Sequence, residues 1–384
     1  MITKKNKRHL IGLSFIICHL SFSVALTSCY NADKDFPDFE GGTTAYFAYQ
    51  NPVRTLILGN DIYDNSLDNA HKCRIWATMG GAYKGRSANV GVVVDETLCD
   101  DLFFLDEGGY PADPVKPLPT SYYKVLSNTI PYNSDTRGYV EVEFTDEFFK
   151  DEKAIGNCYV IPLRMTDANG IDHILSGTPN TANPIRTNSQ NWNVLPKDYV
   201  LYCVKYMNPW QGKYIRRGVD KVTEAGETTT VVRKDFSFYN SDVERFSKQD
   251  PSNPVNQYDE VCGITTKNMT EAIFPVSFKT SGASVLCNLV LKFNGNTCTI
   301  STDDENVTAT GSGEFIEKGT EKAEYKDYQW GSSNGQLVQR DILRLEYSVE
   351  FADKNIQVST NDTLVVQTRE SNKKEFFDYK YVKD

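Results

Sequence analysis

The chain has 384 residues, enough for two domains of ordinary size, and it is acidic, with 51 Asp and Glu against 41 Lys and Arg. A formal net charge of −10 and the lack of a basic cluster after the N-terminus argue against nucleic acid and anionic lipid headgroups as partners. Aromatic residues make up 12% of the chain. This content suits β-structure and also sugar binding, so it does not choose between them.

The N-terminal residues have the pattern of a secreted lipoprotein. Four basic residues within positions 4–8 precede an apolar run from Leu10 to Leu26, which ends in Leu26-Thr-Ser-Cys29. A basic region, a short apolar region and small residues before a cleavage point are typical of a signal peptide. A cysteine directly after that point resembles a bacterial lipobox. The sequence therefore predicts a signal peptide over residues 1–28, lipidation of Cys29 and a mature chain of net charge −14. The alternative is an ordinary secretory signal with a chance cysteine.

Residues 29–44 follow as the lipidated cysteine and a flexible acidic tether, which contains Asp33, Asp35, Asp38 and Glu40. Acidic residues soon after a lipidated cysteine resemble the surface-export signal of Bacteroidetes lipoproteins. We therefore expect a protein anchored by lipid to the outer membrane and exposed at the cell surface. The alternative is a spacer that faces the periplasm.

Cysteine and histidine usage restricts the possible chemistry. Only His71 and His173 remain beyond the signal peptide, so a catalytic triad or a zinc site could contain two histidines at most. We predict no metal or cofactor site. The cysteines beyond Cys29 are odd in number and include no Cys-x-x-Cys pair, so we expect mainly buried free thiols. They are Cys73, Cys99, Cys158, Cys203, Cys262, Cys287 and Cys298.

Residues 45–207 read as short alternating runs separated by turns, which predicts an immunoglobulin-like β-sandwich. In the run Tyr139–Phe144, for example, Val140 and Val142 fall on one face and Glu141 on the other. A loop rich in Asn, Pro, Thr and Ser is expected at 178–196. The fold class predicted for the whole chain is all-β.

Residues 208–384 are expected to form a second domain. The boundary lies at Met207-Asn208-Pro209, where one strand ends and the proline precedes a new strand-like run. This domain contains a long series of predicted strands, and an open sheet would leave its edge strands unpaired. We therefore expect a closed antiparallel barrel, which is lipocalin-like and has no free edges. The strands are expected at Trp210–Ile215, Thr228–Tyr239, Glu260–Thr266, Ala272–Phe278, Val285–Phe293, Thr297–Thr302, Gly313–Glu317, Ile342–Phe351, Thr363–Thr368 and Phe376–Val382.

Two stretches of this domain allow side-chain directions to be assigned. Asn294-Gly295 is typical of a type I′ hairpin turn, which pairs Cys298 with Leu291 and Ile300 with Leu289 and puts all four on a core face. In the run 342–351 the odd-numbered residues, Leu343 to Phe351, are apolar and should point inward.

The first domain resembles the N-terminal domain of unknown function found in Bacteroidetes surface lipoproteins encoded with glycan-utilisation systems. The similar stretches include Pro52–Gly59, Tyr63–Asn69, Leu118–Tyr123, Tyr159–Leu163 and Ile174–Gly177. In some relatives this domain precedes a chitinase-like glycosidase barrel, and in others a smaller β-domain without known activity. Here the second half is too short for a (β/α)₈ barrel and lacks the Asp-x-x-Asp-x-Asp-x-Glu signature. The resemblance implies a sugar-related context at the cell surface but no hydrolase.

Catalytic and metal-binding patterns are weak. The acidic clusters at 100–101, 303–305 and Glu346/Glu350 fall at turns or on the outward face of a strand, which is typical of solvated acids. The stretch 167–172 has oxygen ligands at the spacing of a calcium loop but lacks the terminal bidentate Glu, and a hairpin turn explains it equally well. We therefore predict a protein that is not an enzyme.

Aromatic side chains are the better candidates for ligand binding, because sugars present C–H faces that pack on aromatic rings. Tyr328 and Trp330 border a Gly/Ser/Asn turn, and Trp192 lies in the Asn-rich loop. Trp210 and Tyr214 share a face at the start of the second domain, where packing in the core competes with a binding role. Trp76, within a strand, is expected in the core.

The sequence thus predicts a non-catalytic surface lipoprotein of a glycan-utilisation system that binds or presents a host or dietary glycan. Its expected partners are that glycan, the outer membrane through the lipid anchor, and components of an outer-membrane importer. Three alternatives stay open: a structural or adhesive module without a sugar site, a glycosidase with an unrecognised carboxylate pair, and a lipocalin-like carrier of an apolar ligand. The bulky inward residues of the barrel argue against the last.

Overall fold

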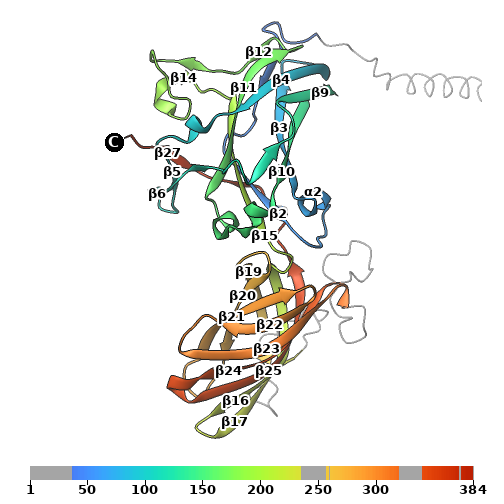
Figure 1. Ribbon diagram of the computed structural model, residues 1–384, viewed down its shortest axis with the longest axis vertical. Helices are drawn as coiled ribbons and strands as arrows, with labels where there is room; N and C mark the ends of the chain where they lie inside the picture. The colour runs from blue at the N-terminus through green and yellow to red at the C-terminus, as the bar shows by residue number, and fades with distance from the viewer. Residues whose placement is uncertain (1–36, 235–256, 259, 320–339, 372, 384) are drawn as a thin grey trace, which may run out of the picture.

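A computed structural model describes residues 37–234, 257–258, 260–319, 340–371 and 373–383 (Figure 1). These residues form two regions built almost entirely from strands, which confirms the predicted all-β class. The signal peptide, Cys29, Tyr328 and Trp330 lie outside the described residues. Within the described part, no helix has the length and apolar content needed to cross a membrane. The short helical segments there are α2 (Ser66–Asn69), α3 (Asp146–Lys150), η2 (Glu96–Cys99), η3 (Glu152–Ile155), η4 (Ser189–Asn191) and η8 (Ala352–Lys354).

The N-terminal region is a β-sandwich of two sheets. The five-stranded sheet has the order β12 (His173–Ile174), β1 (Thr44–Tyr46), β3 (Lys72–Gly80), β10 (Arg137–Phe144), β8 (Tyr123–Val125). The seven-stranded sheet has the order β26 (Glu375–Phe376), β2 (Pro52–Ile57), β15 (Tyr199–Met207), β11 (Tyr159–Asn169), β4 (Arg86–Val94), β9 (Thr129–Asp135), with β7 (Lys116–Pro117) beside β11. Both sheets are mixed, because β2 pairs with β15 and β1 with β12 in parallel.

The sandwich core lies between the two sheets. On β3 the residues Cys73, Ile75 and Ala77 point into it, and on β11 Ile161 and Leu163 meet them from the other side. The alternation that the sequence shows along these strands therefore separates a buried face from an outer face.

The two sheets differ on their outer faces. A second apolar cluster, which includes Leu102, Phe104 and Phe377, covers Val160 and Leu201 on the outside of the seven-stranded sheet. It contains a three-stranded sheet of β27 (Tyr379–Tyr381), β5 (Leu102–Leu105) and β6 (Pro111–Pro114). A hairpin of β13 (Thr178–Pro179) and β14 (Trp192–Val194) lies in the loop predicted at 178–196. In contrast, the outer face of β3 exposes Trp76, which is 47% accessible, so the expected core position of Trp76 is wrong.

The C-terminal region is a closed antiparallel barrel, as predicted. Eight strands close a ring in the order β16, β19, β20, β21, β22, β23, β24, β25, and β25 pairs back with β16. β17 and β18 extend the far end of β16. The bounds are β16 (Gly212–Glu224), β17 (Glu227–Lys234), β18 (Gln257–Tyr258), β19 (Glu260–Thr266), β20 (Glu271–Phe278), β21 (Val285–Asn294), β22 (Thr297–Thr302), β23 (Val307–Ile316), β24 (Ile342–Phe351) and β25 (Ile356–Thr368).

The hairpin between β21 and β22 has a different register from the one predicted. Phe293 pairs with Cys298 and Leu291 with Ile300, two residues from the predicted pairs. The loop is Gly295-Asn296, and Gly295 takes the positive φ of 61°, as the first central residue of a type II′ turn does. Because the shift is an even number of residues, the predicted core face is unchanged.

Several barrel strands are longer than predicted because their inward positions are polar. β16 continues past Ile215, with Arg216 and Asp220 pointing inward, and β25 begins before Thr363, with Thr360 and Asp362 buried. These side chains interrupt the apolar alternation on which the prediction depended. The inward direction predicted for Leu343 to Phe351 on β24 is confirmed.

The end of the chain does not belong to the barrel. The stretch Phe376–Val382, predicted as a barrel strand within 208–384, instead returns to the sandwich, where β26 pairs with β2 and β27 with β5 (Figure 1). Phe377 packs against Phe104 with 5.0 Å between ring centroids. A local pattern predicts a strand but not its partner, which explains the error. The seven described cysteines are all free thiols, most of them buried, as expected.

Candidate functional site

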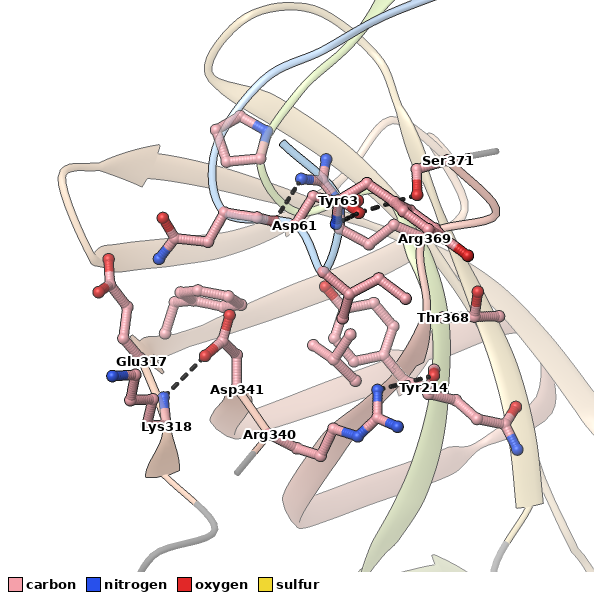
Figure 2. A pocket seen from close by; sticks show the side chains of 16 residues that line it. Asp61, Tyr63, Tyr214, Glu317, Lys318, Arg340, Asp341, Thr368, Arg369 and Ser371 are labelled. Carbon is pink, nitrogen blue, oxygen red and sulfur yellow. Dashed lines mark hydrogen bonds between the residues drawn. The ribbon is translucent and has the colours of Figure 1, made fainter. Parts of the chain in front are cut away.

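A cavity of about 510 Å³ lies at the junction of the two regions (Figure 2). One wall is the loop after β2 of the sandwich, and the other is one end of the barrel, where β16 begins, β23 and β25 end and β24 begins. Its lining residues are Asn60, Asp61, Ile62, Tyr63, Pro209, Tyr214, Phe315, Glu317, Lys318, Arg340, Asp341, Val366, Gln367, Thr368, Arg369 and Ser371.

The wall from the sandwich is held in place by its backbone. Gly59 has a φ of +84°, and its Cα approaches Pro209 so closely that an added Cβ would lie 2.6 Å from the proline Cβ. Glycine is therefore required at the point where the loop after β2 turns against the barrel. The turn places Asn60 to Tyr63 at the cavity.

Asp61 is the most informative side chain of this wall. Its Oδ1 accepts hydrogen bonds from the Tyr63 backbone N–H, at 3.0 Å, and from the Ser371 hydroxyl, at 2.8 Å. Its Oδ2 is buried, and no described residue donates a hydrogen bond to it. Buried carboxylate oxygens in folded proteins nearly always have a partner, so Asp61 keeps an unused acceptor. A rotation of its side chain toward the cavity would be needed for a ligand hydroxyl to reach it.

Arg369 fastens the sandwich loop to the barrel. Its guanidinium donates to the carbonyl oxygens of Leu58, Asn60, Asn208 and Gln211 at distances of 2.6–3.2 Å. Burial lowers the pKa of Arg369, and the nearby Tyr214, Asp61 and Asp341 only partly oppose this shift. The cavity wall is thus held rigidly across the two regions, as a preformed binding site requires.

The barrel side of the cavity carries charges at the ends of β23 and β24. Asp341 accepts a hydrogen bond of 2.7 Å from the Lys318 backbone N–H, and Lys318 has a positive φ of 50°. Burial raises the pKa of the Asp341 carboxyl, and the nearby Glu317 raises it further. Arg340 donates to the Gln367 carbonyl at 3.3 Å, and burial lowers its pKa.

The apolar part of the cavity consists of Tyr63, Phe315 and Tyr214. Phe315 and Tyr214 are buried, and the Tyr214 hydroxyl donates to the Trp210 carbonyl at 2.6 Å, whereas Tyr63 is half exposed. Carboxylates, amides and guanidinium groups beside aromatic rings are the combination that binds sugars. The sugar hydroxyls form hydrogen bonds with the polar groups, and the C–H faces pack on the rings.

The structure places the predicted aromatic residues in different surroundings. Tyr214 lines the cavity, while Trp210 is buried and stacked on Phe293, with 3.7 Å between ring centroids, as part of the barrel core. Trp192 is partly buried on β14 and its indole N–H donates to the Ile185 carbonyl at 2.9 Å. The structure does not bring Trp192 to the cavity.

The segment that contains Tyr328 and Trp330 lies outside the described residues, so their predicted role stays a prediction. Lys318 and Arg340, which flank this segment on either side, both line the cavity.

The calcium interpretation of residues 167–172 is not supported by the contacts of Asp172. Its Oδ2 accepts 2.7 Å hydrogen bonds from both the backbone N–H and the hydroxyl of Thr43, so the carboxylate ties β1 to the turn before β12. The described ranges hold no group of three or more His, Cys, Asp or Glu side chains that could bind a metal ion.

Sequence reasoning missed Asp61, Asp341 and Arg369, the polar residues that define the cavity. They come from three segments far apart in the chain, and each follows or precedes a strand as an ordinary loop residue. The one local signal was Gly59 before a polar loop, together with Pro209 at the predicted boundary.

Comparisons with known proteins agree with this architecture. Residues 209–370 match the model of a domain of unknown function, DUF5627, and residues 39–172 match a model described as an N-terminal domain. The chain is similar to a structural-genomics protein of unknown function from Bacteroides ovatus, whose crystal structure was determined at 2.40 Å resolution. The two sequences are 37% identical, the match covers 90% of this chain and 100% of the other, and the TM-score is 0.74. No curated protein matches the sequence. The chain therefore belongs to the same Bacteroidetes family as the Bacteroides ovatus protein, a family whose function is not established.

Proposed function

We propose that this protein is a non-catalytic surface lipoprotein that binds a carbohydrate in the junction cavity and serves glycan acquisition. The observation that carries the proposal is the buried Asp61 Oδ2, which lacks a partner among the described residues, next to the half-exposed ring of Tyr63. Rotation of the Asp61 side chain toward the cavity would bring this oxygen to a sugar hydroxyl that donates to it, while the sugar's C–H face packs on Tyr63.

The proposed location at the outer membrane depends on Cys29. Metabolic labelling with palmitate should modify the full-length protein, and Cys29→Ala should abolish the label. Protease treatment of intact cells should then degrade the labelled protein if the chain faces outward. An unlabelled full-length protein would contradict the lipid anchor, and complete protection in intact cells would contradict surface exposure.

Binding is tested with the soluble chain, residues 30–384, on a panel of host and plant glycans, followed by calorimetry with the glycans that bind. Asp61→Asn keeps the shape and the Oδ1 acceptor but replaces the partnerless oxygen by an amide donor. We expect it to weaken binding at least tenfold, which corresponds to about 1.4 kcal/mol. Tyr63→Ala should weaken binding by a comparable factor.

The matched control is Tyr110→Ala, which removes an exposed tyrosine at 70% accessibility that does not line the cavity. This variant should bind as the unmodified chain does. Equal binding by all the variants, with unchanged unfolding midpoints, would show that the glycan binds elsewhere. No binding to any glycan would favour the structural or adhesive role.

A second candidate function, glycoside hydrolysis, is favoured by one observation. Asp61, Glu317 and Asp341 line the same cavity, and burial raises the pKa of Asp341, as a general acid requires. Against it, Asp61 and Asp341 each use an oxygen in hydrogen bonds that hold the cavity wall. Release of reducing ends from a bound glycan, lost in Asp341→Asn, would establish hydrolysis, and binding without release would establish the non-catalytic role.

A further inference from the structure

The outer face of the five-stranded sheet carries an aromatic and basic patch, which we call the ladder face. It consists of Lys72, Arg74 and Trp76 on β3 and of Arg137 and Tyr139 on β10. These residues alternate with inward core residues, so all five side chains lie on the same side of the sheet. The equivalent face of the seven-stranded sheet is covered by an apolar cluster, whereas Trp76 is 47% accessible.

The side chains of the ladder face form a continuous stack across the two strands. Trp76 and Tyr139 are directly paired residues, and their ring centroids are 4.7 Å apart with an interplanar angle of 53°. The guanidinium of Arg137 lies 5.5 Å from the Trp76 centroid, and that of Arg74 lies 4.4 Å from the Tyr139 centroid. Each ring therefore has an arginine beside it.

Nearby acids contact the basic side chains of this patch, but these contacts leave guanidinium donors free of short hydrogen bonds. Glu141 contacts Lys72 at 3.2 Å and Arg74 at 3.6 Å, but the second distance is too long for a hydrogen bond. Arg137 is 4.0 Å from Asp135, and both side chains are more than half exposed, so their attraction is weak. Glu143, directly opposite Lys72, also points to this face, so its basic and acidic side chains are close to balance. Two guanidinium groups beside exposed aromatic rings are what distinguish the ladder face.

We propose that the ladder face binds an acidic carbohydrate, a polysaccharide that carries carboxylate or sulfate groups. A guanidinium stacked on a ring keeps its N–H donors in its own plane, where they match the two oxygens of a carboxylate or sulfate. The exposed part of Trp76 takes the C–H face of the same sugar. This site goes beyond the proposed function, because it lies on the sheet of the sandwich and shares no residue with the junction cavity.

The test uses the soluble chain, residues 30–384, and four polymers in affinity electrophoresis and calorimetry. Polygalacturonate carries carboxylates and dextran sulfate carries sulfates. Dextran is the neutral backbone of dextran sulfate, and single-stranded DNA is a polyanion without pyranose rings. We expect binding to at least one acidic polysaccharide, with dextran and DNA bound at least tenfold more weakly. The two acidic polymers distinguish carboxylate from sulfate recognition.

The variants separate the ladder face from other sites. Trp76→Ala should weaken binding of the acidic polymer at least tenfold, and Arg137→Gln should weaken it and reduce its dependence on salt. Trp192→Ala, which removes a tryptophan elsewhere on the sandwich, is the matched control and should bind normally. Arg137 is 65% exposed, so its replacement keeps the test valid even if Trp76→Ala fails to fold.

The proposal is overturned if Arg137→Gln and folded Trp76→Ala both bind the acidic polymers normally, or if dextran or DNA binds as tightly. Asp61→Asn in the junction cavity should leave this binding unchanged. Loss of binding in Asp61→Asn, with normal binding in Trp76→Ala, would show that the acidic polymer binds in the junction cavity and not on the ladder face. Normal binding in Asp61→Asn, with loss of binding in Trp76→Ala, would show that the acidic polymer binds on the ladder face alone.

Discussion

The sandwich and the barrel fill their interiors in different ways. On β3 and β11 of the sandwich, every residue that points into the core is apolar. Inside the barrel, an apolar cluster shares the space with a charged network in which Arg216 and Arg233 meet Asp220 and Asp362. The apolar interior of the sandwich can be predicted from the alternation of apolar and polar residues in the sequence. In the barrel, the inward charged residues interrupt that alternation, so the full length of the strands cannot be predicted from it.

The charged network is closely connected. Arg216 donates to Asp362 at 2.8 Å and to Glu260 at 2.6 Å, and Arg233 forms two hydrogen bonds with Asp220 at 2.9 and 2.5 Å. Asp362 also accepts a 2.8 Å hydrogen bond from the Tyr347 hydroxyl. A network of this kind contributes stability only while it is complete, because all its charges except that of Glu260 have lost their hydration.

The largest expected effect comes from removing one charge of this network. Asp362→Ala leaves Arg216 without its fully buried carboxylate partner, so we expect the free energy of unfolding of the barrel to fall by about 3–5 kcal/mol. Urea denaturation monitored by circular dichroism measures the loss. The control, Glu147→Ala, breaks an exposed pair with Lys150 and should change little. An unfolding midpoint of Asp362→Ala equal to that of the unmodified chain would show that the network is not needed.

The next effect concerns the connection between the two regions. Arg369→Ala removes the hydrogen bonds from the guanidinium to the carbonyls of Leu58, Asn60, Asn208 and Gln211. Since hydrogen bonds to charged groups contribute about 1.5–3 kcal/mol each, the barrel and sandwich should lose part of their mutual stabilisation. Calorimetric unfolding should then separate into two transitions, or separate further if two already exist. An unchanged profile would show that Arg369 does not couple the regions.

The smallest expected effect is in the pH dependence, and it has opposite signs in the two regions. The Thr43 backbone N–H and hydroxyl lower the pKa of Asp172 in the sandwich below its ordinary 3.8, so its contribution is present above that pH and is lost as pH falls through the lowered pKa. Burial raises the pKa of Asp341 at the barrel end above 3.8, so its ionisation destabilises the fold as pH rises through that raised pKa.

Two asparagine variants separate these contributions. Asp172→Asn should destabilise the chain at pH 7 and lose this difference at the most acidic pH. Asp341→Asn should stabilise the chain at pH 7 and match the unmodified chain below pH 3.8. Unfolding midpoints measured between pH 3 and 7 test both. The same sign of effect for the two variants at pH 7 would contradict the assignment.

The comparison also explains which parts of the fold were predictable. Ile342–Phe351 has the predicted bounds, because its alternation is regular, and Glu260–Thr266 has them although the exposed Val261 breaks the alternation. The strands predicted at Trp210–Ile215 and Thr363–Thr368 are shorter than β16 and β25. The inward positions of the missing parts include the charged residues Asp220 and Asp362, which do not fit a hydrophobic pattern. The return of β27 to the sandwich depends on contacts across the whole chain, which no local pattern contains.

The candidate site was less predictable than the fold. Tyr214 was named as a candidate and does line the cavity, but the pattern that singled it out was a shared face with Trp210, which is a core residue. Asp61 and Arg369 meet only because the end of β25 packs against the loop after β2. Such a site exists only once the two regions are assembled.

The central claim is that the junction cavity binds a carbohydrate, and a crystal structure of the soluble chain with a glycan that binds it tests this claim most directly. We expect a sugar in the cavity, with a hydroxyl donating to the Asp61 carboxylate and a C–H face against Tyr63. A bound glycan that leaves the cavity empty would contradict it.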